Sequence, residues 1–160
     1  NIVYCFYDNN NSVMNDGVSV LGKNCLESLD LKEEDVYNAA INNIVDSIVV
    51  GEAKDIIPNT FVNFVILSTE KYKYGAAAFL GADVLKNIAD KMGESALMVM
   101  PVSEEFAAVF PASDTTSVNG TVLKNVIKAL KNLAPDEVLS NNVYLYDRKH
   151  NLLAMESYQL

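Results

Sequence analysis

The fold is decided by the stretch YGAAAFLGADVLKNIADKMGESALMVMPVSEEFAAVFP, which runs from Tyr74 to Pro111. Its middle part carries apolar residues at positions 84, 85, 88, 89 and 92, and these spacings of three and four predict a helix with one buried face. Gly93 follows the last of them, where a residue without a Cβ atom closes a helix readily. Short apolar runs at 76–80, 96–102 and 106–110 predict strands. The stretch therefore predicts strand, helix, strand, strand.

The flanking sequence adds elements on both sides of this stretch. Apolar runs bounded by turn residues predict further strands at 2–7, 18–21, 61–67, 143–146 and 152–155. Helical periodicity predicts helices at 23–29, at 30–49 and from 118 or 119 to 133. Polar residues, glycine and proline mark 51–59 as a connector and 68–74 as a hairpin tip.

These elements predict an α+β domain with a mostly antiparallel sheet covered by helices. From residue 75 to residue 146 the predicted order is strand, helix, strand, strand, helix, strand, which is the order of ferredoxin-like sheets with two helices on one face. A chain of 160 residues suits one domain. We expect it to comprise an opening ββαα unit at 1–57 and a closing ββαββαββ unit at 60–160. Because the chain begins with Asn inside an apolar run, we expect it to be a piece of a longer protein.

Composition argues against several classes of partner and cofactor. The formal net charge is −9 and the basic residues are scattered, so nucleic acid and anionic membrane surfaces are poor partners. No apolar run reaches the roughly 20 residues that span a bilayer. Two cysteines and one histidine give no zinc-site spacing. We expect Cys5 and Cys25 to be buried free thiols in a reducing cytoplasm, with a single bridge between them as the alternative.

Candidate catalytic residues are few. His150 is the one imidazole and lies in a charged turn, where exposure to solvent is expected, and the seven glycines form no phosphate-binding loop, so no cofactor is predicted. The remaining chemical option is paired carboxylates, either Glu104 with Glu105 or Asp136 with Glu137, which could act as acid and base or bind a divalent cation. Neighbouring carboxylates in a loop or a helix start are also ordinary, and neighbours on a strand point to opposite faces.

The segment with the composition of a contact surface is 144–148. Tyr and Arg are enriched at interaction hot spots, and alternate residues of a strand share one face, so Tyr144, Tyr146 and Arg148 are the predicted partner contacts. The alternative is that both tyrosines pack on the sheet with their hydroxyl groups at the rim.

Several segments resemble a known family. They are LDLKEEDVY (29–37), FVILST (64–69), GAAAFL (75–80), VLKNIADKMG (84–93), PVS (101–103) and VLSNNVYLYDR (138–148). Together they resemble a bacterial family of uncharacterised proteins, the domain-of-unknown-function 5688 group. Members often carry a Ser-Ser-x-His-Glu type sequence after the proline that corresponds to Pro101, whereas this chain has no histidine there. The resemblance covers most of the chain and implies no activity.

The sequence thus leads to two hypotheses about function. The first is a non-enzymatic cytoplasmic protein-interaction or regulatory module with an unknown protein partner, and with no nucleic acid or membrane as partner. The second is a carboxylate-dependent hydrolase, or a domain that binds a small ligand or a divalent cation around Glu104 and Glu105.

Overall fold

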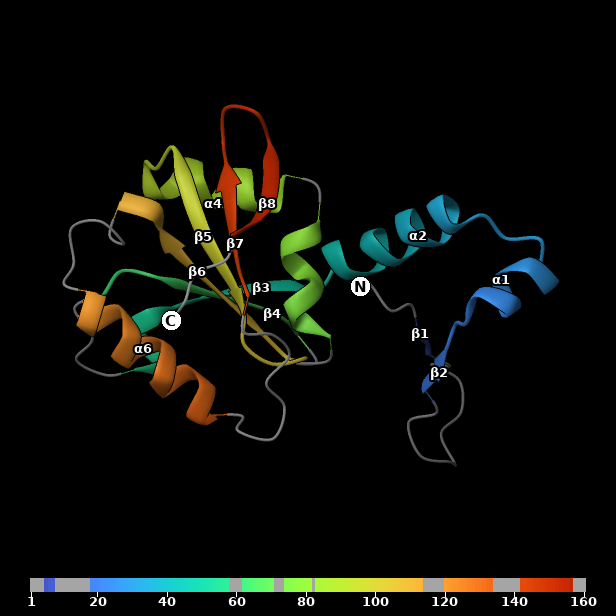
Figure 1. Ribbon diagram of the computed structural model, residues 1–160, viewed down its shortest axis with the longest axis horizontal. Coiled ribbons are helices and arrows are strands. Elements are labelled where there is room, and N and C mark those ends of the chain that lie inside the picture. The colour runs from blue at the N-terminus through green and yellow to red at the C-terminus, as the bar shows by residue number, and fades with distance from the viewer. Residues whose placement is uncertain are drawn as a thin grey trace. The chain divides into compact units, whose positions relative to one another are not determined.

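A computed structural model describes residues 5–7, 18–57, 62–70, 74–81, 83–113, 120–133 and 142–156. The chain divides into two compact units, Asn1–Asn43 and Ile44–Leu160 (Figure 1). The smaller unit contains a hairpin of β1 (Cys5–Tyr7) and β2 (Val18–Val20), followed by α1 (Lys23–Ser28) and most of α2 (Glu33–Val45). Acidic residues fill the first turn of α2, where they interact favourably with the helix dipole. Two strands followed by two helices were expected in this part of the chain, and β1, β2, α1 and α2 are these elements.

The larger unit is built on a six-stranded antiparallel sheet with the strand order β3-β4-β6-β5-β7-β8. Its strands are β3 (Ile48–Glu52), β4 (Val65–Thr69), β5 (Ala96–Pro101), β6 (Ala107–Pro111), β7 (Val143–Asp147) and β8 (Leu152–Glu156). Its helices are α3 (Ala53–Ile56), the 3-10 helix η1 (Gly75–Leu80), α4 (Val84–Met92) and α6 (Gly120–Leu133). The α+β class and the antiparallel sheet are confirmed.

The two faces of the sheet carry separate apolar cores. On one face α4 and η1 pack through Leu85, Ile88 and Phe79 against β5, β6 and β7. On the other face α6 packs through Val126, Ile127 and Leu130. The alternation of side chains along each strand divides the strands between the cores, so that Leu97 and Val99 face α4 while Met98 and Met100 face α6.

This arrangement does not confirm the ferredoxin-like topology. There the last strand returns beside the first, whereas β7 pairs with β5 and the place beside β4 is taken by β3. The connection from β4 to β5 and the connection from β6 to β7 therefore both move toward the β8 end of the sheet. The first connects strands that run antiparallel to the strands of the second. Right-handed crossovers then place their helices on opposite faces. α4 and α6 accordingly lie on opposite faces of the sheet, whereas a ferredoxin-like sheet carries both helices on one face.

Three expected elements also differ in the structure. The run 76–80 was expected to be a strand and forms η1, because alanine has low strand propensity and Tyr74 turns the chain with a φ of 55°. The long helix expected to 49 ends at Val45, and the β-branched residues after it form β3. The strand expected at 61–67 is β4, which ends at Thr69, two residues after the predicted end. Ser68 and Thr69 were expected in a hairpin tip and belong to this strand instead.

The expected connector at 51–59 contains the end of β3 and all of α3, whereas Pro58 lies outside the described residues. Helix α4 ends as expected, with Gly93 in the left-handed conformation at φ 74°. Cys25 is a free thiol, but it is exposed, so the expectation of burial was wrong for this residue. It lies on a six-residue helix whose described side chains are mostly exposed. The side chain of Cys5 lies outside the described residues.

Candidate functional site

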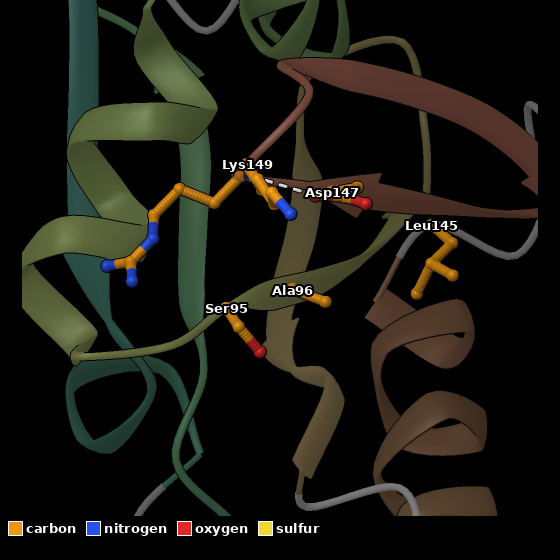
Figure 2. Close-up of a pocket in the computed structure, with 6 residues that line it drawn as sticks. Ser95, Ala96, Leu145, Asp147 and Lys149 are labelled. Carbon is orange, nitrogen blue, oxygen red and sulfur yellow. Dashed lines mark hydrogen bonds between the residues drawn. The ribbon is translucent and has the colours of Figure 1, made fainter.

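An open depression of about 630 Å³ lies where β5 begins and β7 ends (Figure 2). We call its lining the hairpin surface; it consists of Ser95, Ala96, Leu145, Asp147, Arg148 and Lys149. Ala96 pairs with Asp147 across the two strands, and Leu145 pairs with Met98, which belongs to the core under α6. The floor of the depression is therefore the α6 side of the sheet, at the end of the strands near the turn from β7 to β8.

The turn from β7 to β8 is held by the carboxylate of Asp147. Its Oδ1 atom accepts hydrogen bonds from the backbone N–H groups of Lys149 at 2.8 Å and His150 at 3.2 Å, and its Oδ2 atom lies 2.8 Å from Nδ1 of His150. These bonds, led by the one from the His150 side chain, lower the pKa of Asp147. An aspartate that caps its own turn in this way fixes the backbone on which the hairpin surface is built.

Arg148 links the turn to the opposite side of the sheet. Its backbone N–H donates to the carbonyl oxygen of Ser95 at 3.0 Å, and its guanidinium lies 3.2 Å from Oδ1 of Asp90 on α4. Asp90 also accepts from Nζ of Lys86 at 2.8 Å, and this hydrogen bond is the largest cause of the lowered pKa of Asp90. The guanidinium of Arg148 is paired with Asp90 on α4, whereas Lys149 is exposed and lines the depression.

The two tyrosines predicted as partner contacts point away from the depression. Tyr144 is half-buried, with its ring 5.7 Å from that of Phe79, and Tyr146 is 2% exposed in the core under α4. The Tyr146 hydroxyl donates to Oδ1 of Asn151 at 2.8 Å. Contact by Tyr144, Tyr146 and Arg148 stays a prediction, but Tyr146 has almost no surface to offer. These positions match the alternative, in which both tyrosines pack on the sheet.

An apolar surface continues outward from the depression along β8. Leu152 pairs with Asp147 and Ala154 pairs with Leu145, so both lie on the α6 side of the sheet beside the hairpin surface. Leu152 is 58% exposed and Ala154 is also exposed. Sequence reasoning missed this surface, because it treated 152–155 as a closing strand. The signal that could have found it is the run of apolar residues at 152–155, which does not alternate with polar residues.

The predicted carboxylate pair lies on the turn between β5 and β6. Glu104 and Glu105 are exposed, and their carbonyl oxygens accept from the N–H of Ala76 at 3.1 Å and from Oγ of Ser68 at 2.7 Å. The role that the structure gives this turn is packing against η1. Asp136 and Glu137 lie outside the described residues. Within the ranges that are described, no group of three or more His, Cys, Asp or Glu residues could hold a metal ion.

Comparisons with known proteins identify the family alone. A model of the family of unknown function DUF5688 matches residues 1–148 of the chain. No curated protein and no solved structure matches the chain. In the part of the chain that the structure describes, no helix has the length and apolar character needed to cross a membrane.

Proposed function

We infer that this chain, which belongs to the DUF5688 family of unknown function, is a protein-interaction module that binds its partner over the hairpin surface and the neighbouring exposed face of β8. The observation that carries this proposal is the juxtaposition of the open depression with the exposed apolar side chain of Leu152. Exposed apolar surface rimmed by charged residues is typical of protein interfaces.

The shape of the site favours a protein over a small molecule. Small-molecule sites are concave and bury most of the ligand surface. The depression here is open, and its floor of Ala96 and Leu145 continues along the outer strand β8 through Ala154 and Leu152. A broad surface of this kind gives a small molecule few enclosing contacts, whereas it suits a partner with a complementary flat face.

The rigidity of the turn favours binding as well. Asp147 fixes two backbone N–H groups and one imidazole, and Arg148 joins the start of β5 through its backbone and α4 through its side chain. A surface that is ordered before binding loses less conformational entropy when a partner docks. The exposed thiol of Cys25 suits a reducing compartment, which is why we place this function in the cytoplasm. For a carboxylate-dependent hydrolase or cation site at Glu104 and Glu105, we find no comparable observation among the described residues.

Photo-crosslinking tests the proposal in two positions. A photoreactive residue at position 149 of the full chain should give a crosslink to one distinct protein in extracts of the cells of origin. The same residue in place of Asn87, which is exposed on α4, should not. A crosslink from position 149 only to further copies of this chain, or equal crosslinking from both positions, would contradict the proposal.

Two matched pairs of variants then measure the contribution of the surface to affinity. Lys149→Glu should weaken binding of the crosslinked partner about tenfold or more, whereas Lys91→Glu on α4 should leave it nearly unchanged. Leu152→Ser should weaken binding, whereas Val50→Ser on β3, at the other end of the sheet, should not. Calorimetric titration measures all four affinities, and equal loss within either pair would refute the assignment of the surface.

A further inference from the structure

The methionines of the larger unit differ in their access to solvent. Met98 and Met100 on β5 are 2% and 1% exposed and lie in the core under α6. Met92 at the end of α4 is half-buried and packs against the core under α4. Met155 on β8 is 64% exposed, which is the largest exposed fraction among the large apolar side chains that the structure describes. Of these four thioethers, one therefore faces solvent.

The position of Met155 in the sheet leaves its side chain open to small solutes. Met155 pairs with Tyr144 across β7 and β8, so it lies on the α4 side of the sheet. β8 is the last strand in the sheet order, and among the described residues no strand lies beside it on its other side. Met155 also belongs to neither of the two apolar cores. A small molecule can therefore reach this side chain without any opening of the fold.

We propose that Met155 is a modification site, at which hydroperoxides convert the thioether of the folded chain to methionine sulfoxide. In this reaction a lone pair of the sulfur atom attacks one oxygen of the peroxide, so that an S–O bond forms and the O–O bond breaks. With hydrogen peroxide, the second oxygen leaves as hydroxide and takes up the proton of the transferred oxygen, which gives water. The sulfur atom loses two electrons and the peroxide gains them.

Burial selects Met155 over the other three methionines for this reaction. A peroxide can reach Met98 and Met100 only when the sheet and α6 separate, because both side chains are closed off from solvent. Met92 is covered in part by the core under α4. The thioether of Met155 is available in the native state, so its oxidation does not have to wait for local unfolding.

The consequence of the reaction also differs between these sites. A sulfoxide is polar, so at Met98 or Met100 it would place an S–O group inside an apolar core. At Met155 the S–O group stays in water, and the exposed α4 side of β8 changes from apolar to polar while the fold remains. Methionine sulfoxide reductases reverse the change. The proposal stands apart from partner binding, since Met155 is not part of the hairpin surface.

Peptide mapping of the full chain after timed exposure to hydrogen peroxide tests this proposal. In the folded chain Met155 should gain an oxygen atom about tenfold faster or more than Met98 and Met100, with Met92 between them. In urea the four rates should converge, because the fold no longer protects any of them. The exposed thiol of Cys25 also reacts with peroxide, but its peptide is measured separately.

A second experiment measures what the modification does to the protein. Chain oxidised at Met155 should keep the urea midpoint of untreated chain, and treatment with methionine sulfoxide reductases should remove the added oxygen. The control is Met155→Leu, which should leave the slow oxidation of Met98 and Met100 unchanged. Equal rates at Met155 and at Met98 in the folded chain, the same order of rates in urea, or a urea midpoint that falls on oxidation of Met155 alone would each overturn the proposal.

Discussion

Gly75 lies at the start of η1, where its backbone is packed closely against β4 and the turn between β5 and β6. A Cβ atom at this position would lie 2.0 Å from the carbonyl oxygen of Glu105 and 2.7 Å from Cα of Ser68, both of which are backbone atoms. It would also lie 2.6 Å from Oγ of Ser68, which donates to that same carbonyl at 2.7 Å. Gly75→Ala must therefore move either the β5–β6 turn or the start of η1.

The expected cost of Gly75→Ala combines two effects. Overpacking of a core costs about 1–3 kcal/mol. Loss of the hydrogen bond between Ser68 and Glu105 adds about 1 kcal/mol. We expect the free energy of unfolding, measured by urea titration with circular dichroism, to fall by about 2–4 kcal/mol.

The control for this prediction is Gly51→Ala. A Cβ atom at Gly51 would have nothing within 4 Å. Because alanine restricts the unfolded chain, this variant should be neutral or more stable by up to about 1 kcal/mol. If Gly75→Ala changed the free energy of unfolding by no more than its control, the close packing of the β5–β6 turn against η1 would be refuted.

Three further predictions concern the turn and the two cores. Because the pKa of Asp147 is lowered in the folded protein, its carboxylate stabilises the fold above its unfolded pKa of about 3.9, and this contribution disappears as the pH falls through the folded pKa. The urea midpoint of the wild type should therefore drop more between pH 7 and pH 3 than that of Asp147→Asn, and parallel profiles would exclude this role. Tyr146→Phe removes the donor to Asn151 and should cost about 0.5–1.5 kcal/mol, against about 3–5 for Tyr146→Ala, and equal costs would show that the ring does not fill the core. Leu130→Ala and Ile88→Ala should each cost about 2–5 kcal/mol and add in the double variant, because the residues lie on opposite faces, whereas strong coupling would indicate a shared core.

The sequence was informative where a local pattern determines an element. The helix ending at Gly93 and the two strands that follow it could be predicted, because periodicity, apolar runs and a glycine after the last apolar position are local properties. The sequence was misleading at 76–80, because an apolar run of small residues fits a strand or a buried helix equally well. The contact of this segment with the turn of Glu104 and Glu105 is not visible in the sequence. The β-branched residues at 48–50 did carry a strand signal, but it was absorbed into the helix before them.

The topology and the site could not be predicted because both depend on pairing between distant segments. The same element order allows β7 to lie beside β4 or beside β5, and only the second places α6 on the face opposite α4. The burial of Tyr146 follows from that choice, since it lies under α4. The hairpin surface likewise needs the pairing of Ala96 with Asp147, which no local pattern shows.

The measurement that tests the functional proposal most directly is an NMR titration that follows the amide signals of the full chain as the partner binds. On titration with the protein crosslinked through position 149, the largest shifts should fall at residues 94–96 and 145–154, which surround the hairpin surface. Shifts that cluster instead at the turn of Glu104 and Glu105, or on the exposed side of α4, would contradict the account and move the binding site there.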